Sequence, residues 1–200
     1  MSIKTFTPEA VRDLKTTASL VPSSRYLAQA MLAPLPLRQA RCVVEFGPGT
    51  GAMTRPLLAL LPAEAKVLSF EVNPRFCAYL KENLTDPRLE IISGSAERLP
   101  EELAARGLGP VDAALSSLGL TTMPDPLRRG ILQGLVSVLA PQAVFTQFQY
   151  LHGLLAYFQP TNGGLMRFTA ASFLQQYFSQ VSTEIVWRNF PPAFALTCRR

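Results

Sequence analysis

Hydrophobic residues beyond position 40 recur in short runs that are separated by stretches with helical spacing. The apolar runs predict strands at 41–46, 66–71, 89–93, 111–117 and 142–149. The intervening segments predict helices at about 52–61, 74–83, 98–105 and 126–139. Strands that alternate with helices in this way are typical of a doubly wound α/β fold built on a mostly parallel sheet.

The end of the chain departs from this alternation. A helix is expected at about 170–179, and two β-prone runs follow it, STEIVWRNF at 182–190 and AFALTCRR at 193–200. Because the two runs are joined across Pro191 and Pro192, they predict an antiparallel strand pair. A parallel sheet that finishes in an antiparallel pair favours a seven-stranded, Rossmann-like methyltransferase sheet over a dinucleotide dehydrogenase.

Residues 1–40 are expected to form a helical segment ahead of the sheet domain, which takes up residues 41–200. The spacing of apolar residues predicts helices at about 8–18 and 24–33, and the stiff linker PLPL follows them. This segment is expected to cover the site as a lid or to contact a membrane. The stretch PTNGG at 160–164 is expected to be a loop.

Composition bears on the partners and the location of the protein. The 200-residue chain is 48% hydrophobic and only 16% charged, with a net charge of +5 and a mean hydropathy of +0.17. The basic excess favours a negatively charged partner, either nucleic acid or an anionic membrane face. No block of five or more basic residues is present, so nucleic acid is not the expected partner. The N-terminus lacks a signal-peptide pattern, which predicts a cytoplasmic protein, with peripheral attachment to the membrane left open.

The stretch VVEFGPGTG at 43–51 places three glycines at the end of the first predicted strand. Glycine lets a ligand approach the backbone with no Cβ in the way. The spacing G-x-G-x-G fits neither the dinucleotide fingerprint G-x-G-x-x-G nor the phosphate loop G-x-x-x-x-G-K-[ST]. Glu45 favours a cationic ligand, and S-adenosylmethionine carries both a sulfonium and an ammonium group. The residues expected around this cofactor are Glu45, Phe46, Gly47, Gly49, Thr50 and Gly51.

Three further strand ends are expected to complete the cofactor site. Glu71 ends the second strand, where an acidic side chain in this fold can accept hydrogen bonds from both ribose hydroxyls. The turn after the third strand, in ISGSAERL, offers a hydroxyl and a backbone amide to an adenine. The residues predicted from these strand ends are Glu71, Val72, Asn73, Ser95, Ala96, Glu97 and Ser116.

With these residues in view, the chain resembles the class I S-adenosylmethionine-dependent methyltransferases, and more narrowly the bacterial phospholipid N-methyltransferases that act on phosphatidylethanolamine. The segments that carry the resemblance are VPSSRYLAQAM, VVEFGPGTGAMTRPLL, FEVNPRFCAYL, VDAALSSLGL, AVFTQFQY and VWRNFPPAFALTCRR. The resemblance implies methyl transfer to the amine of an aminophospholipid at a membrane surface, without a metal.

An amine acceptor must reach the methyl group with a free lone pair, so its proton has to leave through a hydroxyl, a carboxylate or water. The candidates are Ser116, Tyr150, His152 and Tyr26. Two alternatives stay open. An rRNA adenine N6-dimethyltransferase has a glycine loop similar to EFGPGTGAMTRPL, and a protein that binds S-adenosylmethionine without catalysis would keep the same glycine turn. NFPP at 189–192 is interpreted as a turn and not as an acceptor loop.

Overall fold

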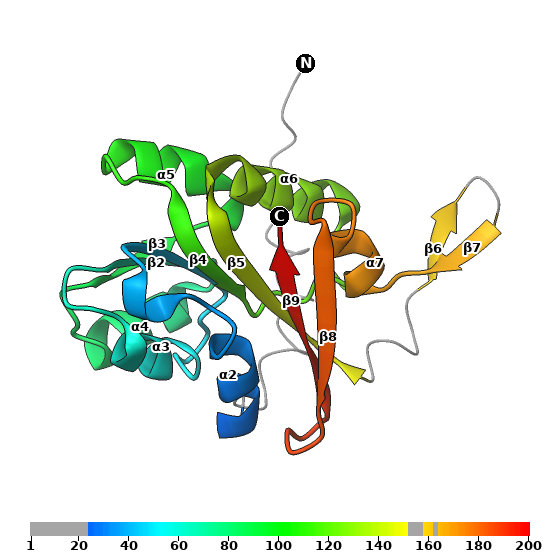
Figure 1. The fold of residues 1–200 in the computed structure, drawn as a ribbon, viewed down its shortest axis with the longest axis horizontal. Helices are drawn as coiled ribbons and strands as arrows, with labels where there is room; N and C mark the ends of the chain where they lie inside the picture. Colours follow the sequence, from blue (N-terminus) through cyan, green and yellow to red (C-terminus); the bar gives the residue numbers. More distant parts are fainter. Residues whose placement is uncertain (1–23, 152–157, 162–163) are drawn as a thin grey trace.

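A seven-stranded sheet with the order β3-β2-β1-β4-β5-β9-β8 forms the centre of the computed structural model, which describes residues 24–151, 158–161 and 164–200 (Figure 1). Strands β1 to β5 and β8 run in one direction, and β9 runs antiparallel to both of its neighbours. The strands are β1 (Cys42–Phe46), β2 (Lys66–Glu71), β3 (Leu89–Ser93), β4 (Val111–Ser116), β5 (Leu139–Tyr150), β8 (Gln180–Val186) and β9 (Ala193–Arg199). The expected doubly wound fold with a terminal antiparallel pair is confirmed.

Helices cover both faces of the sheet (Figure 1). One face carries α2 (Arg25–Leu32), η1 (Leu37–Gln39), α3 (Thr54–Leu60) and α4 (Pro74–Asn83). The other face carries η2 (Ala96–Arg98), α5 (Leu99–Ala105), α6 (Asp125–Val138) and α7 (Ala170–Leu174). Alternate residues of β1 enter the two cores, because successive side chains of a strand point to opposite faces. Val44 and Phe46 pack with α5 and α6, while Val43 packs with α2 and α3.

Most predicted elements lie within a few residues of their observed bounds, and four differ. The helix expected at 170–179 ends at Leu174, because Phe178 leaves the helix to stack on Phe145 with the ring centroids 5.6 Å apart. The segment at 98–105 divides into η2 and α5. Strand β5 starts three residues earlier than expected. The expected loop at 160–164 belongs to a hairpin of β6 (Phe158–Thr161) and β7 (Gly164–Arg167). The helix expected at 8–18 lies outside the described residues.

The antiparallel pair ends at the same edge of the sheet as the glycine turn. Val186 pairs with Ala193, and Ala193 pairs with Tyr150 at the end of β5. The β8–β9 turn (residues 187–192) therefore projects from the carboxyl edge of the parallel strands, which is where ligands bind in open α/β sheets. Within the described ranges, no helix combines the length and the apolar character needed to cross a lipid bilayer.

Candidate functional site

Backbone hydrogen bonds bring the ends of four strands to one edge. Across the sheet, Phe46 is in register with Phe70 and with Ser116. The Gly47 amide donates to the Phe70 carbonyl at 2.9 Å, and the Ser117 amide donates to the Phe46 carbonyl at 2.8 Å. The Gly94 amide donates to the Glu71 carbonyl at 2.9 Å. The segments at 46–51, 71–73, 94–97 and 116–118 therefore meet at this edge, as the sequence predicts.

The three glycines of the turn have left-handed backbones, with φ values of +70°, +57° and +83° for Gly47, Gly49 and Gly51. A Cβ on Gly47 would lie 3.1 Å from Leu118, and one on Gly51 would lie 2.9 Å from Leu84. A Cβ on Gly49 would have no heavy atom within 4 Å. Gly47 and Gly51 are therefore favoured by their left-handed backbones and by close leucine neighbours, whereas Gly49 leaves open space in which a ligand can approach the backbone.

Glu71 links the glycine turn to the start of α4. Its Oε2 accepts from the Gly49 amide at 3.1 Å, and its Oε1 accepts from the Asn73 amide at 2.8 Å. Burial raises the pKa of the carboxyl group, and the backbone donors oppose this shift. A carboxylate has about four lone-pair sites, so each oxygen keeps capacity for a further donor such as a ribose hydroxyl.

The other residues predicted to bind the cofactor near Glu71 differ in their exposure to solvent. Val72 is 54% exposed beside Glu71 and offers an apolar surface to a flat ring. Thr50 is also exposed. In contrast, the Phe46 ring is buried and packs edge-on against Phe70, so only the backbone of Phe46 can face a ligand. Asn73 caps α4 by accepting from the Arg75 amide.

Glu45 is held by hydroxyl groups from two neighbouring elements. Its side chain is fully buried on the α3 face of the sheet, and hydroxyl groups bind both of its carboxylate oxygens. The Thr54 hydroxyl lies 2.8 Å and the Ser69 hydroxyl 2.7 Å from Oε2, and Thr54 also reaches Oε1. Burial raises the pKa of Glu45 to about 7. Glu45 therefore joins β1, β2 and α3 beneath the glycine turn, and its expected contact with a cationic ligand stays a prediction.

Hydrogen bonds between its own residues stabilise the turn after β3. Ser95 caps η2 by accepting from the Glu97 amide at 3.3 Å, and its hydroxyl also lies 3.2 Å from the Glu97 carboxylate. Ala96 is buried. The Glu97 carboxylate lies against Gly130 of α6, where a Cβ would meet it at 2.6 Å. Contact of these three residues with an adenine remains a prediction.

The candidate proton acceptors lie in different places. Ser116 ends β4 beside the glycine turn and accepts from the Leu118 amide at 3.2 Å. Tyr150 ends β5, packs against Phe148, and has a pKa raised by burial. Tyr26 lies on α2, where its hydroxyl accepts from Arg25 at 2.8 Å. His152 lies outside the described residues.

Gln147 is a buried polar residue near the carboxyl edge of the sheet that the sequence reasoning did not consider. It is in register with Ser116 on the neighbouring strand and is 1% exposed. Its Nε2 donates to the carbonyls of Leu118 at 2.9 Å and Phe148 at 2.6 Å, which leaves Oε1 buried and without a hydrogen-bond partner among the described residues. A glutamine in the apolar run AVFTQFQY was the available signal, because a buried polar side chain requires a partner.

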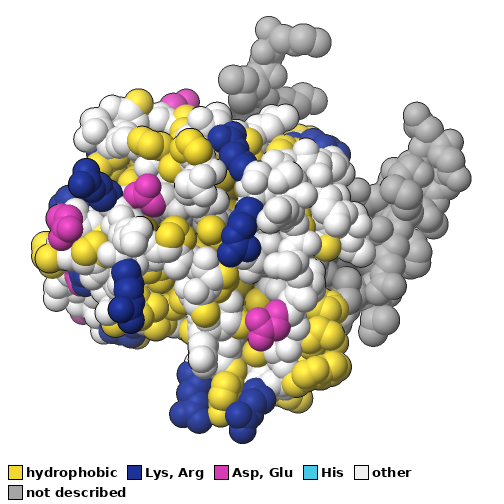
Figure 2. Space-filling view, viewed as in Figure 1, with side chains coloured by type: hydrophobic (Ala, Val, Ile, Leu, Met, Phe, Trp, Pro, Cys, Tyr) yellow, Lys and Arg dark blue, Asp and Glu magenta, His cyan; other side chains and the backbone are white. Residues whose placement is uncertain are grey.

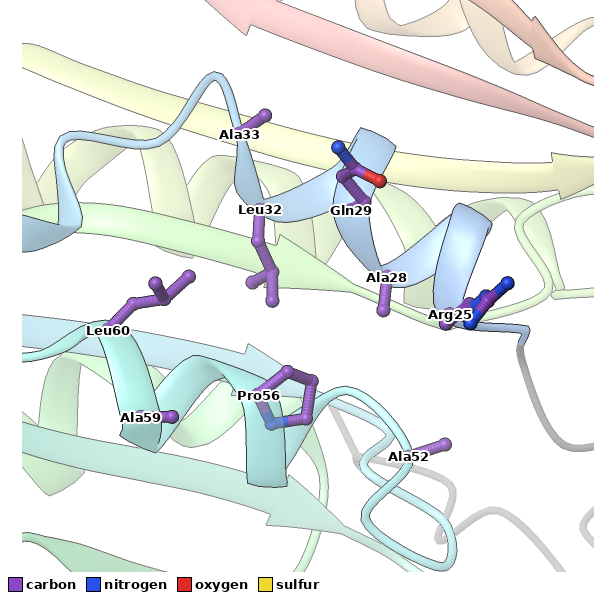
Figure 3. Close-up of a pocket in the computed structure, with 9 residues that line it drawn as sticks. All are labelled: Arg25, Ala28, Gln29, Leu32, Ala33, Ala52, Pro56, Ala59 and Leu60. Carbon is purple, nitrogen blue, oxygen red and sulfur yellow. The ribbon is translucent and has the colours of Figure 1, made fainter.

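An apolar groove of about 680 Å³ runs between α2 and α3, next to the glycine turn. Figure 3 shows Ala28 and Leu32 of α2 facing Pro56 and Leu60 of α3, with Arg25 and Ala52 at the end toward which β1 and β4 run. Ala52 directly follows Gly51, so this end of the groove adjoins the turn. Arg25 and Gln29 are the polar side chains in the lining.

Comparison with known proteins places this site in a family. Residues 43–142 match the model of a methyltransferase domain. The chain is 29% identical over 183 residues to the ornithine lipid N-methyltransferase of Singulisphaera acidiphila, covering 91% of this chain and 88% of that protein. It is 36% identical over 91 residues to the ribosomal RNA small subunit methyltransferase A of Thermosynechococcus vestitus, covering 46% of this chain and 32% of that protein.

A solved structure shows the same fold. The 1,6-didemethyltoxoflavin-N1-methyltransferase of Burkholderia thailandensis, solved with 1,6-didemethyltoxoflavin and S-adenosylhomocysteine, superposes with a TM-score of 0.65 at 21% identity. The match covers 96% of this chain and 83% of that one. The glycine turn, the Glu71 contacts and the matched domain agree, and the chain therefore belongs to the methyltransferase domain family as an S-adenosylmethionine-dependent enzyme.

Proposed function

We propose that this enzyme transfers methyl groups from S-adenosylmethionine to the amine of an aminolipid, such as phosphatidylethanolamine or an ornithine lipid, at a membrane surface. The observation that carries the proposal is the similarity to an ornithine lipid N-methyltransferase over 91% of the chain. The ribosomal RNA methyltransferase cited above covers less than half of the chain, so its substrate is weaker guidance.

The groove between α2 and α3 supports a lipid acceptor. Its lining is almost entirely small or apolar side chains, and its volume lies within the usual range of ligand pockets. Along α2 the groove extends from Arg25 to Ala33, about 12 Å at 1.5 Å per residue. An acyl chain in the groove would place its headgroup near Arg25 and the glycine turn, where Arg25 suits a phosphate or a carboxylate.

The chain's own groups can orient both reactants. The glycine turn and Glu71 hold the donor, whose sulfonium supplies an activated methyl group for in-line displacement. Gln147 Oε1 is a neutral acceptor one strand from Ser116, and we infer that it orients the amine by accepting one of its hydrogens. A neutral acceptor raises the pKa of the ammonium less than a carboxylate would, and the proton that blocks the lone pair leaves to water before methyl transfer. Exclusion of water from the site also lowers the pKa of the ammonium, because desolvation disfavours its charged form.

The test is methylation by the purified protein with S-adenosylmethionine labelled on its methyl group. Vesicles containing phosphatidylethanolamine, vesicles containing an ornithine lipid, and unmodified ribosomal RNA are offered separately. Label in either lipid supports the proposal, and the preferred lipid names the acceptor.

The other outcomes each oppose the proposal. Label in RNA but in neither lipid indicates the ribosomal RNA enzyme. Label in none of them, together with calorimetric binding of S-adenosylmethionine, indicates a protein that binds the cofactor without modifying these acceptors.

A further inference from the structure

Two large aromatic side chains stand out at the β8–β9 turn. Trp187 is 67% exposed and Phe190 is 84% exposed, and Ile185 just before them is 39% exposed. Large apolar side chains gathered at one point are a marker of a contact surface, whereas single exposed ones are ordinary. Figure 2 shows hydrophobic and basic side chains next to one another at the lower end of the molecule, where Figure 1 places this turn.

The turn that carries these aromatics is held from beneath. Asn189 lies between them and is 2% exposed. Its Oδ1 accepts from the Ser24 amide at 3.0 Å, and its Nδ2 donates to the Pro191 carbonyl at 2.7 Å. Because Ser24 caps α2, these bonds fix the turn to the start of that helix. The exposure of Trp187 and Phe190 is therefore built into the fold.

Two cations flank the aromatics. The Arg188 guanidinium lies 4.6 Å and the Arg25 guanidinium 4.9 Å from the centre of the Tyr26 ring. Within the part of the chain that the structure describes, neither of the two arginines forms an ion pair with a carboxylate. The acidic residue nearest to Arg188 along the chain is Glu184 on β8. Two unpaired cations that share one ring attract an anionic group such as a phosphate.

The β8–β9 turn also lies at the carboxyl edge of the sheet, where the candidate site is. The row formed by Tyr150, Ala193 and Val186 is three residues beyond the row that contains Gln147, or roughly 10 Å at 3.3 Å per residue. The turn continues beyond that row. A flat surface that contacts the turn would therefore face the carboxyl edge of the sheet and the Arg25 end of the groove.

We propose that the β8–β9 turn, with the start of α2, docks this protein on an anionic lipid bilayer. Trp187 and Phe190 enter the interface, where aromatic side chains are favoured, while Arg188 and Arg25 contact lipid phosphates. The assignment adds a membrane contact to the proposed function and uses residues other than the N-terminal segment considered from the sequence. Binding through this turn would place the carboxyl edge of the sheet, with the candidate site, against the bilayer.

The experiment exploits Trp187 as the single tryptophan of the chain. Emission of the full-length protein is recorded with vesicles of phosphatidylcholine alone and with vesicles containing phosphatidylglycerol. We expect a blue shift with the anionic vesicles, and quenching when their acyl chains carry bromine. Co-sedimentation with the same vesicles measures affinity.

Matched variants distinguish vesicle binding through the β8–β9 turn from nonspecific binding by other exposed aromatic or basic residues. Trp187→Ala with Phe190→Ala should weaken vesicle binding by about 100-fold, roughly tenfold for each aromatic. Arg188→Glu should weaken binding to anionic vesicles and reduce its salt dependence. The controls are Tyr79→Ala, an aromatic on α4 that is 41% exposed, and Arg38→Glu in η1. Both controls should bind vesicles as the unaltered protein does.

The possible results separate the docking proposal from the proposed function. Co-sedimentation with unchanged Trp187 emission would place the contact elsewhere, and residues 1–20 would then be tested by deletion. A blue shift that follows protein concentration without vesicles would show that the turn pairs with a second copy of the chain. Vesicle binding through the turn without lipid methylation would contradict the proposed function and leave the docking surface intact. Lipid methylation that the turn variants do not change would contradict the docking surface and leave the proposed function intact.

Discussion

Replacing the glycines of the turn by alanine should separate their packing role from their binding role. Gly51→Ala forces an alanine to φ +83° and drives its Cβ to 2.9 Å from Leu84 and 3.1 Å from Leu80. The left-handed backbone costs about 1 kcal/mol, and overpacking costs at least another 1 kcal/mol. Leu80 is fully buried and can yield little. We expect Gly51→Ala to lower the free energy of unfolding by about 2–3 kcal/mol.

Gly49→Ala should behave differently, because its Cβ enters open space. Only the backbone term of about 1 kcal/mol applies to stability, while the new methyl group occupies the space in which the cofactor is expected. Gly107 is the matched control, since its φ of +60° and its open surroundings resemble those of Gly49, and it follows α5 away from the turn. Gly107→Ala should cost the same stability and leave cofactor binding unchanged.

Urea denaturation measures the stabilities of the three variants, and calorimetry measures their affinity for S-adenosylmethionine. The reasoning fails if Gly51→Ala is no less stable than Gly107→Ala. It also fails if Gly49→Ala binds the cofactor as tightly as Gly107→Ala does.

The remaining predictions concern four side chains. Glu71→Ala should weaken S-adenosylmethionine binding by about 1–3 kcal/mol through lost charge-assisted hydrogen bonds, and unchanged calorimetric affinity would rule it out as the ribose ligand. Because the pKa of Glu45 rises from 4.5 in the unfolded chain to about 7 in the fold, the native state holds the proton more tightly and stability should fall as pH rises from 4.5 to 7. Glu45→Gln should flatten that fall by as much as ~3 kcal/mol, and parallel urea midpoints against pH for the two proteins would contradict this. Ala59→Trp, in the groove lining, should raise KM for long-chain aminolipids and leave it unchanged for short-chain ones; equal effects on both would show that acyl chains bind elsewhere. Gln147→Met should lower kcat/KM for lipid at least tenfold with unaltered cofactor affinity, and unaltered lipid kinetics would remove Gln147 from the acceptor site.

The pattern of apolar runs was sufficient to predict the sheet and the edge that carries the site. Strand period, helix spacing and the prolines at 191 and 192 are local properties, so they can be recognised without knowing which strands pair. The glycine spacing and Glu71 were also informative, because only certain side chains permit a left-handed turn or hold its amides. In contrast, the early end of α7 depends on Phe178 finding Phe145 on a distant strand.

The sequence by itself determined the elements, the family resemblance and the cofactor, since each depends on residues that are close together in the chain. Only the tertiary structure decided which residues that are far apart in the sequence contact one another. Glu45 accepts hydrogen bonds from Thr54 and Ser69, and Gln147 is placed beside Ser116. The Asn189 bond to Ser24 joins the last turn to the first described helix and holds Trp187 and Phe190 outward. These relations follow from burial and strand register, which no local pattern of residues specifies.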